Sequence, residues 1–110
     1  MLQMKLSSYE FPVYDYGNDI TFRLYDEDGT AFNASTYTAE VFVSTWALGL
    51  YVDGIVPTWT TQSSGIGKFQ FTETKTVDKP DIYHLEIQLT KAGVKLSSEA
   101  VKVVFKGSVD

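Results

Sequence analysis

The segment DIYHLEIQLT, residues 81–90, decides the fold class, because apolar and polar residues alternate along it. In an extended strand, successive side chains point to opposite faces of the sheet. The predicted inward set is Tyr83, Leu85, Ile87 and Leu89. The predicted outward set is His84, Glu86 and Gln88. The pattern is therefore that of a half-buried strand.

His84 is the only histidine in the chain and shares the predicted outward face with Glu86. A histidine and a carboxylate can exchange protons with a substrate, but they need a pocket and a further reactive group. Nothing else in the sequence indicates a nucleophile or a metal beside them. We predict that His84 is a surface residue, with Lys102 of a neighbouring strand as a cross-strand contact, and that the protein has no catalytic residues and is not an enzyme.

The same alternation recurs in short blocks separated by turn residues. Further inward positions predicted in this way are Ile20, Phe22, Leu24, Ala39, Val41, Val43, Phe69, Phe71, Val101, Val103 and Phe105. No helical periodicity competes with the pattern. The sequence predicts one all-β domain over residues 1–110, an immunoglobulin-like Greek-key β-sandwich of about seven to eight antiparallel strands.

Glycine and proline mark the predicted turns. Asp28-Gly29 ends one strand, and Gly93 centres a tight turn. Asp53-Gly54 lies between two apolar runs and predicts a hairpin turn, since both of its residues tolerate a positive φ. Pro57 has no amide hydrogen to donate, so its strand is expected to lie at an edge or to bend there.

Tyr83 matches a structural feature of immunoglobulin domains. These domains place a tyrosine at the start of the sixth strand, two residues before an inward position, and its hydroxyl bonds back to the preceding loop. Tyr83 follows a loop containing Asp78 and Pro80 and precedes Leu85 by two residues. We expect either this tyrosine corner or a plain core aromatic, and in both cases Tyr83 is structural.

Composition argues against several classes of function. The chain has 110 residues, a formal net charge of −5 and no cysteine. A negative chain without a basic cluster repels phosphate backbones, so we expect no nucleic acid partner. The lack of cysteine excludes disulfides and thiolate chemistry. No apolar run is long enough to span a bilayer, and we expect a soluble protein without a membrane partner or a cofactor.

Two short motifs suggest ligand sites and fail on spacing. An EF-hand loop that began at Asp26 would need glycine and glutamate where the chain has Ala31 and Tyr37. We therefore predict an acidic turn and no metal site, with weak calcium binding as the alternative. The run SSGIGKF, residues 63–69, lacks the spacing of a phosphate loop and precedes a strand, so it is interpreted as a turn.

Aromatic and apolar residues exceed what one inward face requires between residues 42 and 59. The N-terminal residues 1–8 alternate as an edge strand or an arm would, and not as a signal peptide does. Exposed apolar patches mark partner surfaces, and tryptophan and tyrosine are favoured anchors there. The candidate interface residues are Phe42, Trp46, Leu48, Leu50, Tyr51, Trp59, Leu2, Met4 and Leu6. Whether the two tryptophans lie in the core, at a protein interface or against a sugar remains open.

The order of segments resembles the N-terminal immunoglobulin-like domain of phage baseplate upper proteins and related tailed-phage virion domains. The resemblance covers about residues 18–106 and is carried by three stretches. These are DITFRLYDEDGTAFNASTYTAEVFV, SSGIGKFQFTET and DIYHLEIQLTKAGVKLSSEAVKVVF. The chain departs from that family in being short, and TWALGLY, residues 45–51, has no counterpart in it.

The resemblance implies a non-enzymatic structural protein of a tailed virus particle, made in the host cytoplasm and placed in the baseplate, the tail or the capsid surface. Its implied partners are other virion structural proteins, and a homo-oligomer is expected in the particle. The family has no catalytic residues to carry over. The alternative hypothesis is a carbohydrate-binding module that uses exposed aromatic residues.

Overall fold

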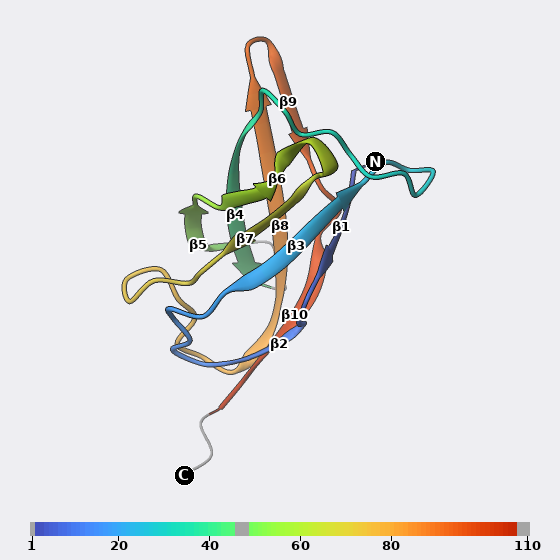
Figure 1. Cartoon of the computed structure of the whole chain (residues 1–110). Coiled ribbons are helices and arrows are strands. Elements are labelled where there is room, and N and C mark those ends of the chain that lie inside the picture. The colour runs from blue at the N-terminus through green and yellow to red at the C-terminus, as the bar shows by residue number, and fades with distance from the viewer. Residues whose placement is uncertain (1, 46–48, 108–110) are drawn as a thin grey trace.

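Two β-sheets face each other across an apolar core in the computed structural model (Figure 1). The structure describes residues 2–45 and 49–107, except for the side chain of Leu50. These residues form ten strands and one short 3-10 helix. The strands are β1 (Gln3–Leu6), β2 (Glu10–Pro12), β3 (Ile20–Tyr25), β4 (Thr38–Thr45), β5 (Leu50–Ile55), β6 (Thr58–Thr61), β7 (Ile66–Phe69), β8 (Asp81–Lys91), β9 (Val94–Ser97) and β10 (Val101–Lys106), and the helix is η1 (Gln62–Ser64).

The strand order is that of an immunoglobulin-like sandwich. One sheet has the order β1-β3-β7-β6, and the other has the order β2-β10-β8-β4-β5 with β9 also paired to β8. Every pairing is antiparallel except that of β2 with β10. The N-terminal segment thus starts in one sheet as β1 and crosses to the other as β2. The predicted fold class is confirmed, and no helix among the described residues is long and apolar enough to cross a membrane.

The predicted alternation sets the core. Along β8 the burial pattern alternates strictly from Tyr83 to Leu89, and the predicted inward positions of β3 and β4 are buried as well. Phe71 lies within 5.9 Å of three other phenylalanine rings, centroid to centroid. Val101 departs from the prediction, since it is only partly buried at the start of β10. The core is therefore a continuous aromatic and aliphatic layer between the sheets.

The tyrosine corner is present. The Tyr83 hydroxyl donates a hydrogen bond to the carbonyl of Lys79 at 2.8 Å, four residues upstream. Burial, together with the nearby Asp81 and Asp78 carboxylates, raises the pKa of Tyr83 above its ordinary value. The ring packs between the sheets in a T-shaped contact with Phe105, with the ring centroids 5.6 Å apart. Tyr83 fixes the loop before β8 to the strand that follows.

The N-terminal residues form an edge strand and not a free arm. Residues of β1 pair in register with β3 from Gln3↔Tyr25 to Leu6↔Phe22. Leu2, Met4 and Leu6 are buried in the core cluster, so their assignment as interface residues was wrong. The physical reason is that β1 pairs with β3 at the edge of the sheet. The apolar residues of β1 therefore point to the same inner face as those of β3, and this face is covered by the core. Leu2 is also held at the far sheet, where Glu99 donates its amide to the Leu2 carbonyl at 2.8 Å.

The predicted hairpin turn at Asp53-Gly54 is wrong. Both residues lie inside β5, where the pairing with β4 shifts register twice, and Gly54 has φ +38°. Glycine is favoured there because this positive φ lies in a region that L side chains rarely adopt. Asp53-Gly54 therefore forms an irregular part of an edge strand, where glycine is common in β-bulges.

The other turn predictions hold. The Asp26 and Gly29 amides bond across the turn at Asp28-Gly29, and Gly93 has φ +75° in the β8–β9 hairpin. The chain leaves one sheet after β5 and enters the other at β6, with Pro57 in the crossing as expected. Strand β9 was not predicted, and just after it the hydroxyl of Ser98 accepts a hydrogen bond from the Ile87 amide at 3.0 Å.

Candidate interaction surfaces

His84 lies on the outer face of the larger sheet, as predicted. Its register neighbours are Lys102 on β10 and Ser44 on β4, and Glu86 follows on the same face. The side chain is half-buried. The outer face of β8 around His84 is therefore a mixed polar surface.

The expected interface aromatics that the structure describes do not form one patch. Trp46 and Leu48 lie outside the described residues, and so does the side chain of Leu50. Phe42 is half-buried on the outer face of β4. Tyr51 turns inward at the β5 edge, with its ring 5.3 Å from that of Tyr83 and its hydroxyl bonded to Asp78.

Trp59 is half-buried against the core. Its ring meets the Phe22 ring edge to face at 5.6 Å. It lies opposite Gly67, where a Cβ would come within 2.7 Å of Phe22. The missing side chain at Gly67 therefore makes room for the Phe22 ring. The remaining surface of Trp59 lines a groove of 660 Å³ that also includes Tyr37, Glu40 and other polar residues.

Among the described residues, the most exposed aromatic side chains lie elsewhere, in the loop of residues 13–19 between β2 and β3. Tyr14 is 62% exposed and Tyr16 is 55% exposed. We call this segment the tyrosine loop. Sequence reasoning missed it, although the signal is present in VYDYGND, where two tyrosines alternate with polar residues before a Gly-Asn turn. The loop lies at the lower end of the sandwich in Figure 1, beside the loop between β7 and β8.

Backbone hydrogen bonds hold the tyrosine loop against that neighbouring loop. The Tyr14 amide donates to the Val77 carbonyl at 2.7 Å, and the Gly17 amide donates to the Phe71 carbonyl at 3.0 Å. The Thr76 hydroxyl donates to the Asp15 carbonyl at 2.6 Å. Both ends of the loop are thus tied to one neighbouring segment.

Asp15 and Tyr14 show that the protein holds the tyrosine loop in one defined backbone conformation. Asp15 is buried between the two tyrosines and accepts a hydrogen bond from the Asn18 amide group at 2.6 Å. Tyr14 has φ +62°, in the left-handed region that a residue other than glycine enters at a cost of about 1–2 kcal/mol. Such strain persists where surrounding contacts impose it and is enriched at binding sites. The backbone that carries both rings is thus held in one conformation.

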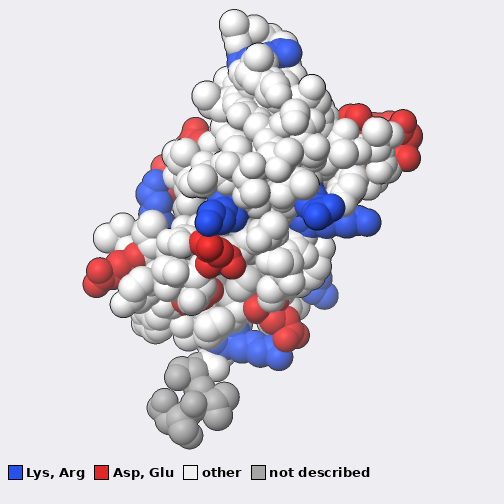
Figure 2. Space-filling view, in the orientation of Figure 1, with Lys and Arg blue, Asp and Glu red and all other residues white. Residues whose placement is uncertain are grey.

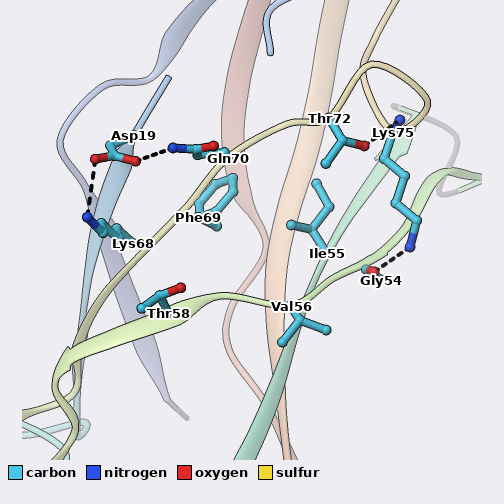
Figure 3. Close-up of a pocket in the computed structure, with 10 residues that line it drawn as sticks. All are labelled: Asp19, Gly54, Ile55, Val56, Thr58, Lys68, Phe69, Gln70, Thr72 and Lys75. Carbon is cyan, nitrogen blue, oxygen red and sulfur yellow. Dashed lines mark hydrogen bonds and ion pairs between the residues drawn. The ribbon is translucent and has the colours of Figure 1, made fainter. Parts of the chain in front are cut away.

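A cleft of 540 Å³ opens beside this loop, between the two sheets (Figure 3). On one wall, Asp19 accepts hydrogen bonds from Gln70 at 2.6 Å and from Lys68 at 3.3 Å, and these hold the pKa of Asp19 below its ordinary value. On the other wall, the Lys75 ammonium donates to the Gly54 carbonyl at 2.7 Å. The charged groups of the cleft are thus engaged with protein partners, and none of these groups is poised as an acid, a base or a nucleophile.

The acidic turn of residues 26–28 is a turn stabilised by its own side chains. The Thr30 amide donates to the Asp28 carboxylate at 3.0 Å, and bonds from Thr30 hold the pKa of Asp28 below its ordinary value. No group of three or more potential metal-binding side chains occurs among the residues that the structure describes. The geometry gives the alternative of weak calcium binding no support.

Comparisons with known proteins give a likeness in fold. No family model matches the chain, and no curated protein matches it. The chain is similar to a solved structure titled "Crystal structure of the Lin-41 filamin domain", at 16% sequence identity and a TM-score of 0.48. That alignment covers 96% of this chain and 91% of the other. The assignment to the immunoglobulin-like sandwiches comes from the strand order and the tyrosine corner described above.

Proposed function

We propose that this protein is a non-enzymatic structural component of a tailed virus particle, a baseplate, tail or capsid-surface module that binds other virion proteins. The observation that carries the protein-binding part is the tyrosine loop, with two exposed rings on a backbone fixed by hydrogen bonds. The viral part comes from the resemblance of the strand segments to tailed-phage virion domains.

The chemistry of tyrosine supports a protein partner. A tyrosine offers a large apolar ring and a polar hydroxyl while losing few rotamers on binding. A loop already held by Val77, Phe71 and Thr76 adds little ordering cost on association. Tyr14 and Tyr16 therefore have the properties of interface anchors.

The absence of an enzymatic role is part of the proposal. The charged side chains of the cleft in Figure 3 are bonded to other side chains or to the backbone, and His84 lies on a different face of the molecule. Acid–base catalysis requires titratable groups that converge on one substrate position. A structural role requires only stable surfaces.

Two measurements test the proposal. Mass spectrometry of purified particles of the source virus is expected to find the protein in a fixed ratio to the major structural proteins. Co-expression with each structural protein encoded beside its gene is then expected to give a stable complex with at least one of them. Absence from particles, together with a gene that lies outside any viral structural region, would overturn the viral role.

The tyrosine loop is tested by the double variant Tyr14→Ser, Tyr16→Ser. We expect its affinity for that partner to fall tenfold or more, because anchor residues each contribute about 2 kcal/mol or more. The matched control is Val94→Ser, which removes an exposed apolar side chain from the β8–β9 hairpin, and it is expected to bind normally. Equal binding by the double variant and the control would exclude the loop as the contact.

The groove beside Trp59 favours a second candidate function, carbohydrate binding. Trp59 and Tyr37 line it together with Gln88 and Thr90, and an aromatic face flanked by polar groups can stack on a sugar ring. Titration with polysaccharides, followed by tryptophan fluorescence, tests this candidate. Saturable quenching that disappears in Trp59→Leu and persists in Phe42→Leu would favour sugar binding, and a flat titration would exclude it.

A further inference from the structure

Strand β6 is an edge strand without a charged side chain. Among the described residues it pairs with β7 alone, which leaves its other backbone edge open. It lies within the longest run of the chain without a charged residue, from Gly54 to Gly67. Its sequence, Thr58-Trp59-Thr60-Thr61, is rich in residues that favour strands. Open edges of this kind are templates for pairing with another chain.

Each of the other edge strands carries a charged side chain. Strand β1 has Lys5, and the short β2 has Glu10 and Pro12. Strand β5 has Asp53, and β9, which pairs with β8 alone, has Lys95. A charged side chain on an edge strand is one means by which natural sheets prevent edge-to-edge association. The contrast singles out β6 as the edge where association is permitted.

We propose that two copies of this chain pair through β6 in antiparallel register, so that the two smaller sheets continue into one. A two-fold antiparallel contact needs only one sequence, because each β6 meets the other in reverse order. The net charge of −5 makes two copies repel each other, and an uncharged edge is where they approach at the lowest electrostatic cost. In Figure 2 the face of the smaller sheet is largely white above β7, and charged side chains lie mainly below that area.

The geometry also limits the strength of this contact. Pro57 precedes β6, and the register with β7 shifts between Trp59 and Thr61, so pairing is confined to a few residues. Val56, 75% exposed at the sheet crossing, adds one apolar side chain beside the edge. An interface this short lies below about 1,200 Å², the size range of weak complexes. We expect a weak dimer that strengthens when copies are held together in a larger assembly.

Disulfide trapping tests the contact directly, because the chain has no cysteine of its own. In Thr60→Cys, the two introduced thiols lie close to the two-fold axis, and air oxidation is expected to yield a covalent dimer. The control Val94→Cys places one exposed thiol on the β8–β9 hairpin and leaves β6 unchanged. The proposal requires the Thr60 variant to form dimer at least tenfold faster, and equal rates in the two variants would overturn it.

A second pair of variants keeps the test independent of cysteine chemistry. Thr60→Lys introduces a like charge on each β6 and is expected to weaken dimerisation at least tenfold in analytical ultracentrifugation. Thr60→Val keeps a β-branched, uncharged residue at the same position and is expected to retain the dimer. A wild-type protein that stays monomeric at the highest concentration, or a lysine variant that dimerises as well as the valine variant, would contradict the inference.

This contact uses a different surface from the tyrosine loop, so the two proposals fail separately. Loss of self-association in Thr60→Lys with virion-protein binding intact would support both assignments. Both assignments would also be supported if the Tyr14, Tyr16 double variant lost binding to the virion protein while disulfide trapping through Thr60→Cys stayed intact. Absence of any virion partner would remove the proposed function and leave the dimer standing.

Discussion

The two lateral sides of the sandwich are built in opposite ways. On one side the N-terminal segment passes from β1 in one sheet to β2 in the other, and its apolar residues enter the core. On the other side the chain crosses once, between β5 and β6, and leaves a cleft of 540 Å³ and a groove of 660 Å³ around an exposed Val56. We call these the closed side and the open side.

The difference separates residues that stabilise the fold from residues that are available to a partner. Substitutions on the closed side are expected to lower the free energy of unfolding, since they remove buried contacts. Substitutions on the open side are expected to change association and to leave unfolding nearly unchanged. The distinction fails if a closed-side substitution changes only association, or if an open-side substitution lowers the free energy of unfolding.

Removal of residues 1–8 is expected to have the largest effect. The truncated chain loses β1 and the burial of Leu2, Met4 and Leu6, and it exposes the edge of β3. Domains of this size have a total stability of only about 5–15 kcal/mol. We expect the truncated protein to be unfolded or aggregated by circular dichroism. A truncated protein with the unfolding midpoint of the full chain would show that the segment is an arm after all.

Phe11→Ala tests the closed side with a single substitution. The Phe11 ring lies 5.3 Å from that of Phe105 and 5.9 Å from that of Phe71, and it anchors β2 to the core. We expect urea unfolding to show a loss of about 3–5 kcal/mol. The control Val56→Ala, on the open side, is expected to lose less than about 0.5 kcal/mol. Similar losses in the two variants would remove the distinction between the sides.

Much of this fold could be predicted from the sequence because its signals are local. Alternation along β8 gave the inward residues, and the spacing from Tyr83 to Leu85 gave the tyrosine corner. Alternation also marked Leu2, Met4 and Leu6 as one face. It could not say whether that face meets the core or a partner, since this depends on β3, which is distant in the sequence.

The surfaces were harder to predict for the same reason. Asp53-Gly54 has the composition of a hairpin turn, and only the pairing with β4 shows that it continues a strand. The tyrosine loop owes its fixed backbone to the loop carrying Val77, which is distant in the sequence. The open edge of β6 follows from strand order, which residue patterns do not specify. Local chemistry thus predicts elements, and exposure depends on how the elements are assembled.

Tyr83→Phe is expected to have an intermediate effect, because it removes one hydrogen bond and keeps the ring. The Lys79 carbonyl loses its donor, and the free energy of unfolding is expected to fall by about 1–2 kcal/mol at neutral pH.

The pH dependence of stability, compared between the wild-type protein and Tyr83→Phe, tests the contribution of the Tyr83 hydroxyl. Burial raises the pKa of Tyr83 in the folded state above its ordinary value of 10.0. The folded state therefore holds this proton more tightly, so its contribution is constant below about pH 10 and is lost as the pH rises through the folded pKa. The stability of the wild-type protein should fall more steeply above pH 10 than that of the variant. Parallel alkaline curves would contradict this assignment.

Tyr14→Gly is expected to have the smallest effect on stability, and one of opposite sign. Glycine adopts φ +62° without the steric cost that tyrosine incurs there, and the entropy lost by a more flexible unfolded chain offsets part of the gain. We expect thermal unfolding to show a change between zero and a gain of about 1 kcal/mol. Tyr16→Gly, the same substitution in the same loop at a residue without a positive φ, is expected to lose about 0.5–1 kcal/mol of unfolding free energy.

If both variants lose the same amount of stability, the left-handed conformation of Tyr14 stores no strain. If Tyr14→Gly is the more stable and also binds its virion partner less well, the chain retains a strained tyrosine because binding requires it.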